Sequence, residues 1–284
     1  MTHEQRILRM YSYGPGIGSF DPNSMGRSDR EYLSLGYWDA DTKTYHQAAH
    51  ALLQYVLDHA GFSQGQRILD VACGYGAETF SIVERFKPES VAAIDITPRH
   101  VAYAAGKALH LGLDGCVGFQ QANACSLPFG NGRFNRVLAV EGPAQFCTRA
   151  QFFREAYRVL TPHGEMIVTD AIVTDNSKTA ARWERMLLKT VARSWLVPPE
   201  NCVSNGLYRT QLQRSGFAVL SFESLGRHVF PGYAANAFDT ATYRARVQQR
   251  GVAAATVLTA ISYVLGALYQ RGLIDYVFVK ARKR

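Results

Sequence analysis

A glycine turn that follows an acidic residue is the first place in this chain where residue types and spacing could do chemistry. In the segment LDVACGYGAET, Asp70 ends an apolar run, and Gly74 and Gly76 follow it. Glycine adopts positive φ values at little cost, so such a turn lets the backbone approach a ligand closely. A helix that begins near Glu78 would add the positive end of its dipole. The segment therefore predicts a nucleotide-binding turn.

Two kinds of nucleotide compete for this turn. A dinucleotide site has a third glycine where Thr79 stands here, and it would bring a pyrophosphate towards Asp70, whose like charge repels it. Asp70 suits a ligand that carries an amino group and a sulfonium. Asp95 ends the next apolar segment and could bind ribose hydroxyls in either case. An NAD-dependent oxidoreductase therefore stays as an alternative.

The elements that must position these residues alternate along the chain. Helical spacing is predicted for residues 45–59, and apolar strands are predicted in RILDVA, SVAAIDI, VGFQQA, FNRVLAVEG and EMIVTDAIV, with helices between them. A further helix and strand are predicted in YRTQLQRSGFAVLSFESL, and a final strand in IDYVFVKARK. Such alternation predicts an α/β fold, a doubly wound and mostly parallel seven-stranded sheet of the Rossmann-like kind.

Three segments fall outside that alternation. Residues 1–44 are expected to form an irregular N-terminal arm, which precedes a domain over residues 45–284. Two mostly helical insertions, at about 174–205 and 226–272, are expected to cap the sheet. The uncharged stretch GVAAATVLTAISYVLGALYQ is long enough for a bilayer but diluted by Thr, Ser, Gly and Gln. We expect a buried helix or pocket wall there and no stable membrane insertion.

Bulk composition narrows the class further. The chain has 284 residues, a net charge of +8, and five cysteines without framework or metal-ligand spacing. Free thiols in a reducing cytoplasm are expected, and no metal. The basic charge leaves a nucleic-acid-binding role open, although no nucleic-acid-binding stripe is present and no nucleic-acid partner is expected.

Five segments, taken in order, resemble the motifs of class I S-adenosylmethionine-dependent methyltransferases. ILDVACGYG is similar to the first motif, and AAIDIT, QANACSLPF, FNRVLAVEG and FREAYRVLTPHGEMIVTD are similar to those that follow. YLSLGYW resembles the cofactor-covering arm of the branch with sterol, ubiquinone, tocopherol and natural-product tailoring methyltransferases. The resemblance covers roughly residues 32–173 and the final strand. It implies S-adenosylmethionine as cofactor and S-adenosylhomocysteine as product.

The resemblance also implies a set of cofactor-binding residues. These are Tyr37, Asp70, Ala72, Gly74, Gly76, Asp95, Ile96, His100, Asn123, Ala124 and Glu141. Ala72 stands where the family often has glycine. Asn123 stands where an aspartate usually receives the adenine amino group, and an asparagine carbonyl can still accept that bond while its amide donates to a ring nitrogen.

The implied methyl transfer requires that the methyl donor and the acceptor be aligned, and it requires a base only for some acceptors. Methyl transfer is an in-line displacement, and a base is needed only if the acceptor must lose a proton. Glu141 and His228 are the candidate catalytic residues. The arm and insertions are apolar and aromatic, which predicts a lipophilic acceptor such as an isoprenoid, terpenoid-alkaloid or polyketide-like metabolite, methylated on oxygen or carbon. Self-association into a homo-oligomer is expected. A non-catalytic binding module and, because of the basic charge, an RNA methyltransferase are the remaining alternatives.

Overall fold

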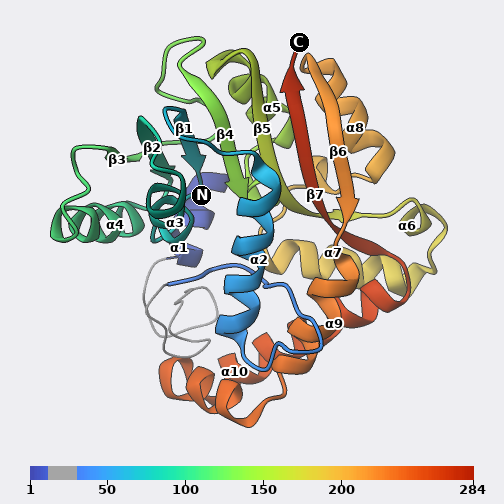
Figure 1. Ribbon diagram of the computed structural model, residues 1–284. Coiled ribbons are helices and arrows are strands. Elements are labelled where there is room, and N and C mark those ends of the chain that lie inside the picture. Colours follow the sequence, from blue (N-terminus) through green and yellow to red (C-terminus); the bar gives the residue numbers. More distant parts are fainter. Residues whose placement is uncertain (12–30) are drawn as a thin grey trace.

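A seven-stranded sheet forms the centre of the computed structural model, which describes residues 1–11 and 31–284 (Figure 1). The strand order is β3-β2-β1-β4-β5-β7-β6. Strands β1 to β5 are parallel, and β7 runs antiparallel to both of its neighbours. The strands are β1 Arg67–Val71, β2 Ser90–Asp95, β3 Val117–Gln121, β4 Phe134–Val140, β5 Leu160–Val173, β6 Phe217–Ser224 and β7 Ile274–Lys283. The predicted fold class is thus confirmed.

Helices cover both faces of the sheet because successive strand residues point to opposite sides. Ile68 packs in one apolar cluster with α2 and α3, whereas Leu69 packs in a second cluster with α5 and α8. The helices are α1 His3–Tyr11, α2 Tyr45–Ala60, α3 Ala77–Phe86, α4 Pro98–His110, α5 Arg149–Val159, α6 Asn176–Thr179, α7 Arg182–Ser194, α8 Asn205–Arg214, α9 Gly226–Asn236 and α10 Thr240–Gln270, with the 3-10 turns η2 Pro143–Gln145 and η3 Pro199–Asn201. Near-continuous burial of the central strands follows from this double cover.

Helix α2 shows how local sequence sets the element boundaries. The Thr44 hydroxyl accepts from the Gln47 backbone amide at 3.2 Å, and the Gln47 side chain accepts in return from the Thr44 amide at 3.1 Å. This capping box fixes the start of the helix. Gly61, with φ 72°, ends it in the left-handed conformation that glycine favours.

Helices α7, α9 and α10 lie beyond the carboxyl ends of the parallel strands (Figure 1). Helix α10 is long and apolar enough, by length and composition, to cross a membrane. Gly251 interrupts it with φ 78° and ψ 163°, and Arg246 donates to the Thr259 hydroxyl across the interruption at 3.2 Å. Gly266 brings it against α9, since a Cβ there would lie 2.6 Å from that of Ala234.

The N-terminus differs from the irregular arm that the sequence predicted. Residues 3–11 form α1, with Glu4 in the first turn and Arg9 in the last, an arrangement that complements the helix dipole. Ile7 is buried against the rest of the protein. The prediction of an irregular start missed this helix because its stability depends on that contact. The rest of the predicted arm, residues 12–30, lies outside the described residues.

Gly216, between α8 and β6, offers a test of the packing of this connection against α5. Its φ is 96°, and a Cβ would lie 2.5 Å from the Tyr157 ring. Gly216→Ala should therefore lower the free energy of unfolding by roughly 2–4 kcal/mol, from strain and overpacking together. Gly65→Ala is the control, because its φ of 73° carries the strain while nothing lies within 4 Å of its Cβ. Equal losses in denaturant unfolding would contradict the packing account.

Candidate active site

A cavity of about 1120 Å³ lies at the carboxyl ends of the parallel strands. Here the strand order reverses between β1 and β4, which is the usual ligand position in an open parallel sheet. Helix α1 covers one side, and α7, α9 and α10 close the other. The cavity therefore joins the predicted cofactor motifs to the predicted cap.

The glycine turn presents its backbone to this cavity. Ala72 and Gly74 line the wall, with φ values of 63° and 52°. Gly76 begins α3 with φ 87°, and a Cβ on it would lie 2.8 Å from Phe80 and 3.2 Å from Phe119. Gly76 therefore allows close packing behind the turn, whereas the sequence analysis expected it to meet the ligand.

Asp70 lies beneath the turn rather than in the cavity wall. Its side chain is buried and accepts a hydrogen bond from the Thr79 hydroxyl at 2.6 Å. Burial raises the pKa of the Asp70 carboxyl to about 8, with a further contribution from the charge of Glu78. The bond to Thr79, at the position of the missing third glycine, ties the turn to the first turn of α3.

Asp95 organises the end of β2. One carboxylate oxygen accepts from the Gly74 amide at 3.0 Å, and the other accepts from the Thr97 amide at 2.8 Å. The His100 Nδ1 lies 3.3 Å from the second oxygen. Tyr11 of α1 meets the His100 ring edge-on, with centroids 5.7 Å apart. Asp95 thus fixes the turn and the start of α4 while facing the cavity.

The next part of the wall is formed by Ile96, which follows β2, and by Asn123 and Ala124, which follow β3. The Asn123 carbonyl accepts from the Cys125 amide at 2.7 Å, and its amide donates to Glu4 of α1. The structure therefore brings Ala72, Gly74, Asp95, Ile96, His100, Asn123, Ala124 and Glu141 together around one cavity. Their predicted contact with a cofactor stays a prediction.

Glu141 follows β4 with an uncommon backbone for a residue other than glycine, φ 57°. A residue held there costs about 1–2 kcal/mol, and such strain gathers at functional sites. The carboxylate accepts from the Leu35 amide at 2.9 and 3.1 Å and from the Tyr276 hydroxyl at 2.8 Å. Burial raises the pKa of Glu141 to about 7, although both hydrogen bonds act in the opposite direction. A carboxyl poised in this range can exchange protons near neutral pH.

Glu78 is a cavity residue that the sequence analysis placed only as a helix start. Burial raises the pKa of its carboxyl to about 7, and the charge of Glu141 adds to that rise. Among residues 1–11 and 31–284, neither Glu78 nor Glu141 forms an ion pair with lysine or arginine. A positively charged ligand would stabilise the ionised form of both, which fits an ammonium and a sulfonium.

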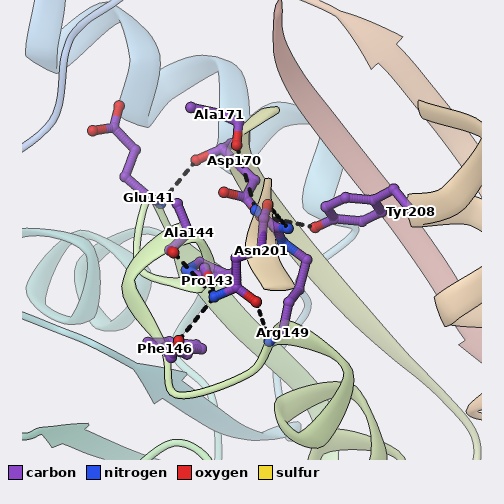
Figure 2. A network of polar contacts seen from close by, with 10 residues as sticks. Glu141, Pro143, Ala144, Phe146, Arg149, Asp170, Ala171, Asn201 and Tyr208 are labelled. Carbon is purple, nitrogen blue, oxygen red and sulfur yellow. Dashed lines mark hydrogen bonds and ion pairs between the residues drawn. The ribbon is translucent and has the colours of Figure 1, made fainter. Parts of the chain in front are cut away.

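A buried ion pair fixes the loop that carries Glu141 (Figure 2). Arg149 donates from Nε to Asp170 at 2.6 Å, and both side chains are fully buried. Asn201 accepts from the Arg149 amide at 2.8 Å and donates to the carbonyls of Ala144 and Phe146 at 3.0 and 2.8 Å. Figure 2 shows the Glu141 carboxylate pointing away from this network. The network therefore fixes the loop, while the Glu141 carboxylate faces the cavity.

Helix α1 and Gln145 form the part of the site that sequence reasoning missed. Tyr11 donates to the Gln145 carbonyl at 2.6 Å, and the His3 ring lies 2.7 Å from the Gln145 backbone oxygen. Gln145 also donates to the Trp195 backbone oxygen at 2.8 Å. The sequence shows only that a polar residue follows β4, and this does not predict its contacts with His3, Tyr11 and Trp195.

Two predicted site residues lie away from the cavity. The Tyr37 ring stacks on His228, with centroids 4.3 Å apart, and also on Tyr55 at 5.5 Å. Arg227 donates to the His228 ring at 2.8 Å. Neither Tyr37 nor His228 lines the cavity, so the structure does not bring them together with the other predicted site residues, and their predicted roles stay predictions. Both side chains join the arm to α2 and α9 instead.

The cap end of the cavity is mainly apolar. Its walls come from α7, α9, α10 and β7, and they include Leu188, Phe230, Tyr233, Leu258, Ile261, Leu265, Leu268 and Ile274. Basic side chains also line this end, namely Arg185, Lys189, Arg193, Arg246 and Arg250. Arg6 and Arg9 of α1 line the cavity as well, so cations occur at the cap and on α1, whereas Glu78, Asp95 and Glu141 lie at the strand ends.

The sheet order and the carboxylates around the cavity fit the class I S-adenosylmethionine-dependent methyltransferases that the motifs resemble. Residues 68–164 match the family model described as a methyltransferase domain, so this part of the chain is a methyltransferase domain. S-adenosylmethionine is the cofactor of the family. The observed carboxylates suit its positive charges, so the residues present fit it.

Named relatives support the same family. The chain is 31% identical to erythromycin 3''-O-methyltransferase of Saccharopolyspora erythraea over 70% of this chain, and the match spans 65% of that protein, just under two thirds. It is 25% identical to 27-O-demethylrifamycin SV methyltransferase of Amycolatopsis mediterranei, over 89% and 90% of the two chains. Geranyl diphosphate C-methyltransferase of Streptomyces coelicolor A3(2) shares the fold, with a TM-score of 0.78, 15% identity and coverage of 100% and 99%.

Arg149→Met should lower the free energy of unfolding by about 3–5 kcal/mol, because Asp170 would stay buried without its partner. Equilibrium denaturation measures the loss. Lys178→Met is the matched control, since Lys178 pairs with Asp175 at 2.6 Å with both side chains largely in solvent; its midpoint should stay unchanged. A loss for Arg149→Met no larger than that of the control would contradict the assigned role of the pair.

Proposed function

We propose that the protein transfers the methyl group of S-adenosylmethionine to an oxygen or carbon atom of a lipophilic small molecule. The observation that carries this proposal is the single cavity in which a carboxylate-lined end meets an apolar end. When bound, S-adenosylmethionine supplies a methyl group that the sulfonium charge has already activated. The protein's residues then need to bind, align and exclude water.

Named residues divide this work. Asp95 is proposed to accept hydrogen bonds from the ribose hydroxyls, and Gly74 to allow the backbone to approach. Glu78 and Glu141 supply negative charge that faces the cavity. The apolar walls of α9 and α10 would hold the acceptor, while arginines of the cap suit an acceptor with oxygen-bearing substituents.

Oxygen is the favoured target atom, because Glu141 is placed to take a proton. Its carboxyl lines the cavity, and its pKa of about 7 matches that of a general base near neutral pH. Two relatives are named as an erythromycin 3''-O-methyltransferase and a 27-O-demethylrifamycin SV methyltransferase. Carbon methylation is the second candidate, since the fold is shared with a geranyl diphosphate C-methyltransferase. Neither an oxidoreductase nor an RNA methyltransferase gains support.

We further propose a cytoplasmic, self-associating protein without stable membrane insertion. The five cysteines are free thiols, which suits a reducing compartment. Trp183, Phe238 and Tyr263 of the cap helices and their connection are more than half exposed, which favours burial against another copy.

Transfer of a labelled methyl group into an extract of the source organism tests the proposed activity. Label should enter the organic phase, and Asp95→Asn should raise the KM for S-adenosylmethionine roughly tenfold or more, because hydrogen bonds to a charged acceptor are lost. Asp114→Asn is the control, since Asp114 is exposed and away from the cavity. Label confined to the aqueous or macromolecular fraction would overturn the lipophilic acceptor.

The pH profile of kcat/KM for S-adenosylmethionine tests the role of Glu141, because this ratio reports ionisation in the protein before the cation binds. The carboxylate is the active form, and the raised pKa keeps it protonated below about 7. We expect log kcat/KM to rise with pH up to about 7 and then level off. Glu141→Gln should remove this limb and lower kcat by roughly 100-fold, whereas Glu89→Gln, at an exposed position, should change neither. A flat profile with near-normal turnover in Glu141→Gln would favour methylation of carbon.

A further inference from the structure

The first turn of α1 reaches the end of β3, on the far side of Asp95 from the central strands. Asn123 follows β3 and donates its amide to the Glu4 carboxylate, and both residues line the cavity. Since β2 and β3 are neighbours, Asn123 lies next along the sheet edge from Asp95. A nucleoside whose ribose meets Asp95 would therefore extend its base towards Glu4 and Asn123.

These two side chains place an acceptor beside a donor. The Asn123 carbonyl accepts from Cys125, and one amide hydrogen is used on Glu4 Oε1. An asparagine amide has two hydrogens and a carboxylate has two oxygens, so each group keeps further capacity. Among the described residues, Glu4 Oε2 has no hydrogen-bond partner. The wall thus offers an anionic acceptor next to an amide donor.

Adenine carries the complementary pattern on one edge, an exocyclic N–H donor beside a ring-nitrogen acceptor. Hypoxanthine reverses it, with an exocyclic oxygen beside a ring N–H. A carboxylate cannot donate a hydrogen bond, so it opposes the exocyclic oxygen and favours the amine. An asparagine alone discriminates poorly, because its amide can rotate to present either group.

We propose that Glu4 is a specificity-determining residue that accepts a hydrogen bond from the 6-amino group of the cofactor's adenine. Helix α1 holds it in place through the bonds from Tyr11 and His3 to Gln145. The inference rests on the proposed function, because it requires that the protein bind S-adenosylmethionine. The proposal assigns a role to helix α1, whose Glu4 is 119 residues from Asn123 in the chain.

Calorimetric binding of S-adenosylhomocysteine and of its 6-oxo analogue, S-inosylhomocysteine, tests the proposal without a turnover assay. The unaltered protein should prefer the adenine compound by roughly tenfold or more, as expected for a hydrogen bond to a charged group. Glu4→Gln should reduce this preference to within about threefold, because a glutamine amide can serve either base. The bond to Asn123 can persist in this variant, so α1 stays folded.

Glu89→Gln is the matched control, since it removes the same charge at an exposed position outside the cavity, and it should keep the full preference. Equal melting temperatures of the three ligand-free proteins would show that folding is unchanged. An unaltered preference in Glu4→Gln would overturn the role of Glu4 and leave the proposed function standing. Failure of the unaltered protein to bind S-adenosylhomocysteine would overturn both.

Discussion

The buried pair of Arg149 and Asp170 is the interaction on which the geometry of the site depends. Asp170 lies on β5, next to Thr169, whose backbone oxygen accepts from the Glu141 amide at 3.0 Å. Arg149 begins α5, so the pair joins both ends of the segment between β4 and α5 to the neighbouring strand. A buried pair of this kind gives little net stability over apolar residues of the same volume. What it does here is fix one loop path, because either charge left alone would be strongly unfavourable.

The paired charges contrast with the carboxyls on the other side of the same loop. Asp170 forms an ion pair with Arg149, whereas Glu78 and Glu141 are buried without a basic partner among the described residues. Burial raises the pKa of both glutamate carboxyls to about 7. Desolvation makes their ionised forms unfavourable until a cation arrives. The protein therefore separates the charge that holds the fold, on α5 and β5, from the charge that faces the cavity, on α3 and after β4.

The sequence was sufficient for the elements whose signals are local. The strand that carries Asp70, the turn after it and the position of Asp95 follow from apolar runs and glycine spacing, and all three lie as expected. The parallel order then places the strand ends together by geometry alone. The hydrogen bond between Asp70 and Thr79 could not be predicted in this way, because spacing gives the neighbourhood of a carboxylate but not the direction in which it points.

Contacts between distant segments were beyond local reasoning. Tyr11 and Gln145 are 134 residues apart, and Tyr37 was placed by likeness to an arm although its ring stacks on His228. The aromatic density of the arm was visible, but not which ring each side chain meets, since ring stacking depends on the final packing of α2 and α9. The helical form of α1 was hidden for the same reason, because a nine-residue helix is marginal without tertiary contacts.

Gln145 shows why the cover and the cap of the cavity must be considered together. Its side chain accepts from Tyr11 of α1 and donates to the backbone at Trp195, just beyond α7. Displacement of α1 would leave the Gln145 carbonyl without this donor, and displacement of the α7 end would leave its amide without that acceptor. The residue itself stands on the loop that Asn201 and Arg149 hold rigid. Helix α1, the end of α7 and the sheet therefore meet at the short turn that carries Gln145. The buried pair of Arg149 and Asp170 beneath this turn sets the position of all three.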